Sequence, residues 1–280
     1  MSAPKPLDPS ASPRAMLGAE LRHQRVQAAL SQGELGRPLF VSASFIGQLE
    51  SGTRRMQTEY ATYFDETFKT NGFFARNCEA LKKSKYPDHF AEAAEAEAIA
   101  TVIKEYAQSL IPGLLQTEGY ARAVFVSGLP TTSDERIGEL VSARLERANL
   151  LKDPTEPVVW TVLDEAVLRR PVGGPAVMAE ALRHIAALMR RRRIILQVLP
   201  FDAGGHPALE GSLKLMEFSD AAPLVYLESF GSGQLLDDPA SVTRYELAYH
   251  LVGASALSPE KSLALLESAA EDYTHDEQHS

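Results

Sequence analysis

The spacing of apolar residues changes once along this chain, and that change constrains the fold more than any other feature. From Pro13 to about Lys85 the apolar residues recur at helical spacing and the segments between them are short, which is typical of a compact all-helical unit. Runs rich in β-branched and aromatic residues, flanked by Pro, Gly or Asp, come much later in the chain. We therefore expect an N-terminal all-α domain followed by a C-terminal α+β domain.

The C-terminal part is expected to form a mixed sheet with helices packed against it. Its first two predicted strands enclose a helical segment, AVMAEALRHIAALMRRRR, and so give a β-α-β order. Before the strands, HFAEAAEAEAIATVIKEYAQSL and TTSDERIGELVSARLERANLL are predicted to be helices, and two helices separated by Ser258 and Pro259 close the chain. The predicted strands are Val158–Leu163, Ile194–Leu199, Ser212–Phe218 and Leu224–Glu228.

The segment KKSKYPDH marks a domain boundary, because it is charged and contains Pro87. The sequence is accordingly divided into a disordered tail at 1–13, a helical domain at 14–85, a larger domain at 86–275 and a short tail at 276–280.

Charge is distributed unevenly between these domains. Residues 1–85 hold 12 Lys and Arg against 8 Asp and Glu, whereas residues 86–280 hold 16 against 29. Because nucleic-acid phosphates are bound by concentrated positive charge, the net charge of −9 excludes a whole-molecule nucleic-acid coat and leaves the basic head as the candidate.

The remaining composition excludes several classes of protein. The single cysteine, Cys78, rules out an intrachain disulfide and a multi-thiolate metal site. No apolar run approaches the roughly 20 residues of a membrane span, and the N-terminus has no signal-peptide pattern. We expect a cytoplasmic protein with no membrane partner, no metal and no cofactor.

Capping residues mark two helix starts in the head. Ser31 and Glu34, three residues apart, form the pattern of a capping box. A third helix is predicted to begin at Ser42, whose hydroxyl can cap it, and to end at Gly52, which can adopt the left-handed conformation that closes a helix.

The outer face of this third helix is expected to carry small residues. Ile46 and Leu49 point inward, which leaves Ala43, Ser44, Gly47 and Gln48 on one exposed face. Such a face fits deep into a major groove, where Gln48 can make a bidentate contact to adenine and Ser44 can donate or accept.

Three further residues are placed for phosphate contacts. Gln32 opens the second helix beside free N–H groups, and Arg54 and Arg55 follow the third helix as cations near the DNA backbone.

These positions resemble the helix-turn-helix of the Cro/C1 repressor type, also called the XRE family. The resemblance implies that the second helix crosses the DNA backbone and that the third enters the major groove. The residues that would inherit contact roles are Gln32, Ser42, Ser44, Phe45 and Gln48. The resemblance rests on Leu17, Leu21, Arg22, Arg25, Leu30, Ser31, Gln32, Leu35, Val41, Ser42, Ile46, Leu49, Glu50 and Gly52.

Four positions depart from that family's pattern. Gly36 replaces the usual alanine, and Gly47, where serine is usual, costs about 1 kcal/mol of helix propensity relative to alanine. Pro38 removes an N–H and Phe40 replaces the usual turn glycine, so the turn is expected to close by a different geometry. A helical bundle that makes only protein contacts, its DNA binding having decayed, is the alternative.

The C-terminal part is similar to the antitoxin-like, Scr1-type domain found behind this helix-turn-helix in actinobacterial regulators. The segments that carry the similarity are IPGLLQTEGYARAV, LDEAVLRRPVGG, LQVLPFDAGGHPAL and ALSPEKSLALL. The resemblance implies a transcriptional regulator that is commonly paired with a small, separately encoded partner protein, and it supplies no catalytic residues.

Four charged residues directly after the first predicted strand form the candidate effector site: Asp164, Glu165, Arg169 and Arg170. Loops at that position gather ligand groups in α/β folds, so a small anionic or peptide-like effector could bind there. The alternative is an ion-paired helix start, with carboxylates near the positive end of the helix dipole.

Enzymatic activity has little support in the sequence. His206 lies in a glycine-rich loop without a second His or a Cys nearby, and no recognised catalytic pattern occurs. An enzyme using the region of Asp164, Glu165 and His206 remains the alternative. The sequence predicts a non-enzymatic regulator that binds double-stranded operator DNA as a homodimer.

Overall fold

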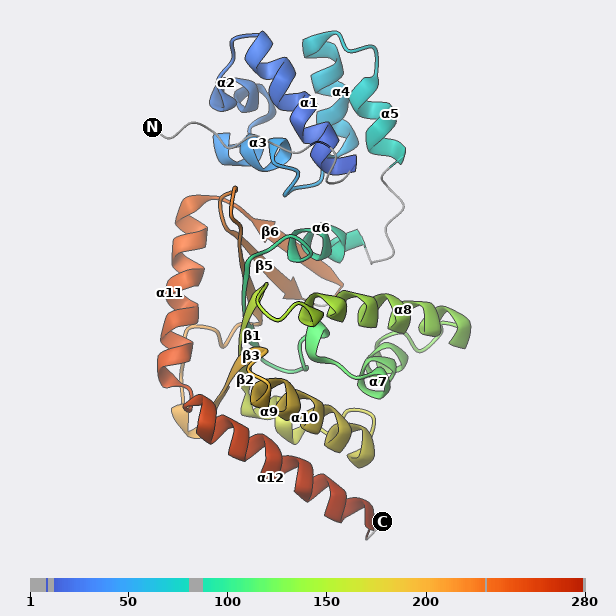
Figure 1. The fold of residues 1–280 in the computed structure, drawn as a ribbon, viewed down its shortest axis with the longest axis vertical. Coiled ribbons are helices and arrows are strands. Elements are labelled where there is room, and N and C mark those ends of the chain that lie inside the picture. Colours follow the sequence, from blue (N-terminus) through green and yellow to red (C-terminus); the bar gives the residue numbers. More distant parts are fainter. Residues whose placement is uncertain (1–8, 10–12, 81–87, 230, 279–280) are drawn as a thin grey trace. The chain divides into compact units, whose positions relative to one another are not determined.

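The computed structural model describes residues 9, 13–80, 88–229 and 231–278 (Figure 1). The chain divides into two compact units. The first consists of Met1–Ala100, Glu217–Leu224 and Leu235–Val242, and the second of Thr101–Met216, Val225–Gln234 and Thr243–Ser280. The predicted boundary between residues 85 and 86 and most of the predicted N-terminal tail lie outside the described residues.

The head is all-helical, as predicted. Each α-helix of the head contributes buried side chains to its core, whereas its 3₁₀ turn contributes none. Leu21, Ile46 and Phe64 are fully buried at the centre. The third predicted helix is confirmed, with Ser42 as its N-cap. The elements are α1 (Pro13–Gln27), α2 (Gln32–Gly36), the 3₁₀ turn η1 (Arg37–Leu39), α3 (Ala43–Glu50), α4 (Thr58–Phe68) and α5 (Phe73–Ala80).

One helical prediction is wrong in its second half. The segment that begins with HFAEAAEAEA forms a helix, α6 (Asp88–Glu97), and then a strand, β1 (Val102–Ala107). The strand pairs in parallel with β2 (Val158–Asp164), and this pairing buries Ile103 and Tyr106. A pairing partner more than 50 residues away thus overrides the local helical pattern.

The remaining strands complete a six-stranded mixed sheet with the order β3-β2-β1-β4-β5-β6. All four predicted strands are present, and β1 and β6 are additional. Strands β1, β2 and β3 are mutually parallel. The strands not yet given are β3 (Ile194–Leu199), β4 (Leu213–Glu217), β5 (Leu224–Ser229) and β6 (Ser232–Leu236).

Helices pack on this sheet and on one another within the second unit. The helix predicted between the first two strands is α10 (Pro175–Arg190), and α12 (Pro259–Gln278) lies beside it (Figure 1). Helix α12 continues through Gln278, beyond the point where a tail was predicted. The other helices are α7 (Glu118–Gly128), α8 (Asp134–Arg147), α9 (Glu165–Arg169) and α11 (Pro239–Ser255). Three short 3₁₀ turns are η2 (Gly113–Leu115), η3 (Ala148–Lys152) and η4 (Phe201–Ala203).

Within the described ranges, none of the helices has the length and hydropathy that a bilayer span requires.

Candidate nucleic-acid interface

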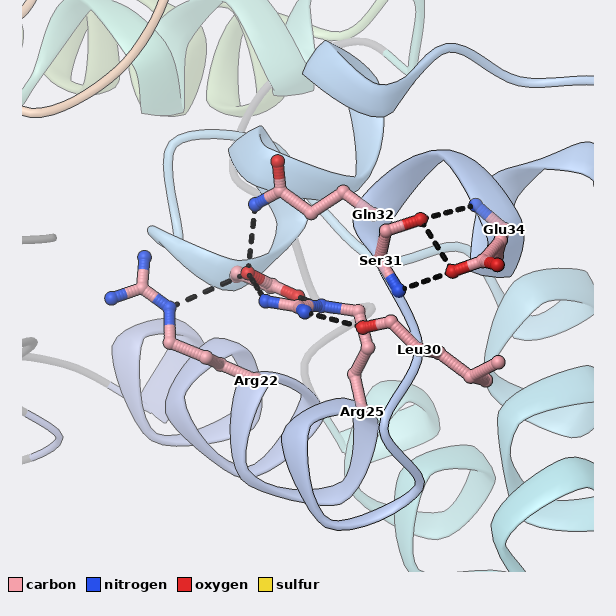
Figure 2. A network of polar contacts seen from close by, with 7 residues as sticks. Arg22, Arg25, Leu30, Ser31, Gln32 and Glu34 are labelled. Carbon is pink, nitrogen blue, oxygen red and sulfur yellow. Dashed lines mark hydrogen bonds and ion pairs between the residues drawn. The ribbon is translucent and has the colours of Figure 1, made fainter. Parts of the chain in front are cut away.

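A buried carboxylate, Glu50, joins the three helices that carry the predicted interface. Its partners Arg22, Arg25 and Gln32 are labelled in Figure 2. From α1, Arg25 donates Nε to Glu50 Oε1 at 2.5 Å and Nη2 to Oε2 at 3.1 Å, while Arg22 Nε lies 3.4 Å from Oε2. From α2, Gln32 donates Nε2 to the same Oε2 at 2.9 Å. Glu50 is the last residue of α3 and has no solvent exposure, so these donors replace water in stabilising its buried carboxylate. This arrangement, the Glu50 network, fixes α3 relative to α1 and α2.

Gln32 has a different partner from the one predicted. The sequence places its amide against a DNA phosphate, whereas in the structure the amide donates to Glu50 and the residue is half-buried. Gly47 makes this possible, because a Cβ at that position would lie only 3.3 Å from Gln32 Nε2. The glycine that departs from the family pattern therefore leaves space for the Gln32 carboxamide.

The predicted capping box at the start of α2 is confirmed. Ser31 Oγ accepts from the backbone N–H of Glu34 at 3.2 Å, and the Glu34 carboxylate accepts from the backbone N–H of Ser31 at 2.8 Å. The Ser31 hydroxyl also donates to Glu34 Oε2 at 2.6 Å, and this bond together with the one from the Ser31 N–H lowers the pKa of Glu34. The starts of α2 and α3 are thus both capped by a serine, since Ser42 Oγ accepts from the Phe45 N–H at 2.9 Å in the same way.

The turn between α2 and α3 closes in the left-handed conformation, contrary to the expectation from Pro38 and Phe40. Phe40 has φ +56° and ψ +32°, so it adopts the conformation usually left to glycine. Its N–H donates to the Arg37 carbonyl at 3.1 Å, and the Val41 N–H donates to the Gly36 carbonyl at 3.2 Å. Pro38 is accommodated because it lies in the first turn of η1, where its missing N–H has no helical partner to lose.

Gly36 is needed for this tight turn. A Cβ there would lie 2.7 Å from the Val41 carbonyl oxygen and 3.2 Å from Ile46 Cγ1. The departure from alanine at this position therefore accompanies the close approach of the turn to α2.

The exposed face predicted for α3 is only partly present. Ser42 and Ala43 are exposed and Ser44 is half-buried, with its Oγ buried and without a hydrogen-bond partner in the described part of the chain. Gly52, with φ +71°, follows the helix as predicted and donates its N–H to the Leu49 carbonyl at 3.2 Å.

Two of the predicted contact residues are buried instead of exposed. Phe45 is 7% exposed and packs edge-to-face on Tyr60, with ring centroids 5.1 Å apart, because it shares the inner side of α3 with Leu49 one turn later. Gln48 is 1% exposed, and neither atom of its carboxamide has a hydrogen-bond partner among the described residues. It follows Ser44 by one turn, and the Ser44 hydroxyl is buried as well, so the polar atoms on this side of α3 are not exposed.

The two arginines after α3 also have neighbours. Arg54 places its guanidinium 4.4 Å from the centroid of the Phe45 ring and 3.6 Å from Asp237 Oδ2 in the same compact unit. Arg55 is half-buried, and its charge affects the pKa of Arg14 and that of Glu95. Carboxylates thus compete with phosphates for at least Arg54.

In the second unit, the predicted effector residues form an ion-paired helix start. Asp164 caps α9 by accepting from the Ala166 N–H at 2.8 Å. Glu165 receives Arg169 Nη2 at 3.0 Å, four residues later, and accepts from the Phe201 N–H at 3.1 Å. Arg170 follows the helix as its C-cap. These contacts match the alternative that the sequence left open.

Two family models match separate parts of the chain. A helix-turn-helix domain model matches residues 16–72. A model described as a domain of unknown function, DUF5753, matches residues 90–268, which is more than half of the chain. The chain belongs to the DUF5753 family. No curated protein and no solved structure matches it. The helix-turn-helix domain supports DNA binding and transcription regulation as the role of the head.

The DUF5753 domain holds a polar cluster of Tyr106, Asp164 and His206. The sequence grouped Asp164 with His206 as a candidate enzyme region but did not include Tyr106. Tyr106 donates its hydroxyl to Asp164 Oδ2 at 3.1 Å, and the Tyr106 hydroxyl oxygen lies 3.5 Å from His206 Nε2. Burial and the Asp164 charge raise the pKa of Tyr106, so the phenol stays protonated and serves as a hydrogen-bond donor. Tyr106 was missed because its segment was predicted to be helical, whereas the parallel pairing of β1 with β2 brings it to Asp164.

In the ranges that the structure covers, no three His, Cys, Asp or Glu side chains of the DUF5753 chain gather where an ion could be held. The hydrogen bonds of the Tyr106 cluster join the ends of β1 and β2 to the glycine-rich loop that carries His206.

Proposed function

We propose that the protein is a sequence-specific transcriptional regulator of the Cro/C1 type that binds double-stranded operator DNA through α3. The observation that supports this most directly is the Glu50 network, which fixes α3 against α1 and α2 and leaves its N-terminal residues Ser42 and Ala43 exposed. A rigid helix with small residues at its exposed end can approach base edges closely.

Within this proposal, Ser44 and Gln48 read bases. The Gln48 carboxamide is buried without a hydrogen-bond partner, which is unfavourable for a polar group, and an adenine edge would supply both a donor and an acceptor. Reading requires that the groups covering Gln48 move away. Arg54 and Arg55 contact phosphates once their present partners release them, whereas Gln32 stays bound to Glu50 and supports α3.

The DUF5753 domain is proposed to carry the dimer contacts and to sense either a small-molecule effector or a small, separately encoded partner protein, in an antitoxin-like manner. We propose no enzymatic activity. An effector of this kind acts by binding one arrangement of the dimer more tightly than the other.

A second candidate, a protein-interaction module with decayed DNA binding, is favoured by one observation. Gln48 is buried and Gln32 is engaged by Glu50, so two of the main contact residues are occupied or covered. The experiment below distinguishes the two candidates.

The test is binding of the full-length protein to duplexes from its own promoter region and to random duplexes, followed by fluorescence polarisation at several salt concentrations. We expect a preference for one duplex and an affinity that falls with salt. Gln48→Ala should lose roughly 1 to 3 kcal/mol of discrimination at one base pair, whereas Arg54→Ala should weaken all duplexes alike.

Gln27→Ala, a change of the same kind at the exposed end of α1, is the matched control and should leave both affinities unchanged. A flat salt dependence with no preference among duplexes would support the protein-interaction module instead. Equal losses on cognate and random DNA for Gln48→Ala would reassign Gln48 to a phosphate contact.

A further inference from the structure

A cavity of about 560 Å³ lies in the second unit. It is bounded by α11, by the loop before β4 and the first residue of β4, by the end of β5 and by the start of β6. Its lining residues lie within the segments 207–213, 227–229, 232–234 and 244–251 but do not include every residue of them. Sites for small molecules typically enclose about 300 to 1,000 Å³. None of the effector residues predicted from the sequence lines the cavity: Asp164, Glu165, Arg169 and Arg170 all lie elsewhere.

Helix α11 supplies one wall of the cavity with a second apolar stripe. Its first stripe, which includes Val242, Tyr249 and Val252, is buried. Leu247 and Leu251 lie on another side, line the cavity, and remain 58% and 49% exposed. A helix at the surface of a folded domain needs one apolar stripe for its own packing, so the second is available to a ligand.

A cation stands at one end of this second stripe. Arg244 precedes Leu247 by three residues and Leu251 by seven, and therefore lies on the same side of α11. Its guanidinium lies 5.4 Å from the centroid of the Tyr245 ring, and no carboxylate of the described residues is within ion-pairing distance. Arginine at an otherwise apolar wall favours a planar anion such as a carboxylate.

The acidic residues of the lining limit how much negative charge a ligand can carry. Glu210 lines the cavity from the loop before β4 and would repel a polyanion. Glu228 also contributes to the lining and adds a second negative charge there. It shares a side of β5 with Tyr226, and burial together with the Glu228 charge raises the pKa of Tyr226. A ligand with a single negative charge at Arg244 fits this distribution better than a phosphate ester.

We infer that the cavity binds a small monocarboxylate with an apolar body, the carboxylate at Arg244 and the body against Leu247 and Leu251. This inference rests on the sensing role proposed for the DUF5753 domain, and it names the chemical class of the effector. Leu213 and Leu227 complete the apolar part of the wall.

The test is isothermal titration calorimetry of the full-length protein with octanoate, octan-1-ol and octylamine, three probes with the same apolar chain and different head groups. Octanoate should bind most tightly. Arg244→Gln should weaken octanoate at least 10-fold and leave octan-1-ol unchanged, whereas Leu251→Gln should weaken both. Arg136→Gln, at a side chain that is 57% exposed on α8, is the matched control and should change neither.

Equal binding of the three probes, or an Arg244→Gln protein that still binds octanoate as the wild type does, would overturn the inference. The absence of octanoate binding would overturn it as well. Because these titrations contain no DNA, they can fail while the promoter preference of the full-length protein persists. In that case the ligand class is wrong and the DNA-binding proposal stands.

Discussion

At the scale of single residues, Phe40 shows how much local strain the interface tolerates. A non-glycine residue in the left-handed region is unfavourable by about 1 to 2 kcal/mol. Phe40 adopts this conformation with its side chain 98% exposed, so no packing of that side chain compensates the strain. The turn geometry is instead maintained by the Ser42 cap and by the hydrogen bonds to the Arg37 and Gly36 carbonyls.

Phe40→Gly is therefore expected to stabilise the head by about 1 kcal/mol, because glycine adopts φ +56° without steric conflict. Denaturant unfolding of the full-length protein measures the change. Val26→Gly, at another large and exposed apolar residue but in the last turn of α1, should instead destabilise slightly, by up to about 0.5 kcal/mol, because glycine has the lower helix propensity. A loss of stability for Phe40→Gly would mean that the phenyl ring contributes contacts that its exposure does not reveal.

At the scale of elements, the close approach of α1 to the end of α3 holds the interface together. A Cβ at Gly18 would lie 2.4 Å from the Glu50 carbonyl oxygen and 2.5 Å from that of Leu49. Only glycine allows α1 to lie this near, and this distance lets Arg22 and Arg25 reach the Glu50 carboxylate. The spacing of Leu17 and Leu21 predicts α1 from the sequence, whereas the need for glycine at position 18 is visible only in the structure.

Gly18→Ala should force α1 away from α3, with a destabilisation of about 2 kcal/mol or more and a loss of DNA affinity. Gly33→Ala is the matched comparison, because a Cβ in α2 would lie 4.0 Å from its nearest neighbour, Ala43 Cβ. It should leave the fold intact and stabilise α2 by up to about 1 kcal/mol. Thermal unfolding and polarisation of the two variants measure both effects, and equal losses would show that the α1–α3 distance is not limiting.

At the scale of the whole molecule, the charge distribution agrees with the proposed role. Positive charge is concentrated in residues 1–85 and negative charge in the remainder, so non-specific adhesion to DNA is confined to the head. An acidic remainder also disfavours binding of the whole chain along DNA, and specificity then depends on the few residues of α3.

If the protein acts as a homodimer, two copies of α3 should address half-sites about one helical turn, roughly 34 Å, apart. Hydroxyl-radical footprinting on the cognate duplex should show two protected segments with this spacing, and inserting five base pairs between them should abolish tight binding. A single protected segment that tolerates the insertion would indicate a monomeric reader. Analytical ultracentrifugation without DNA gives the oligomeric state independently.

Much of the fold follows from the sequence because the signals are local. Ser31 and Glu34 specify the start of α2 together, Ser42 specifies the start of α3 and Gly52 follows its end, each through contacts within four residues. Four β-branched runs specify strands. The strand β1 was missed because its identity depends on a partner more than 50 residues away. The cavity on α11 was missed for the same reason, since its walls come from three separate parts of the chain.

The sequence by itself determined the two-part organisation, the helix caps, the parallel strands around α10 and the candidate residues of α3. Only the tertiary structure decided which of those residues are accessible. Periodicity assigns Gln48 to the side of α3 away from Ile46, but whether that side meets solvent depends on what else packs there, and in the structure it is 1% exposed. Similarly, the amide of Gln32 reaches Glu50 because Gly18 and Gly47 allow α1, α2 and α3 to approach one another closely. No local sequence pattern encodes the distances between these helices.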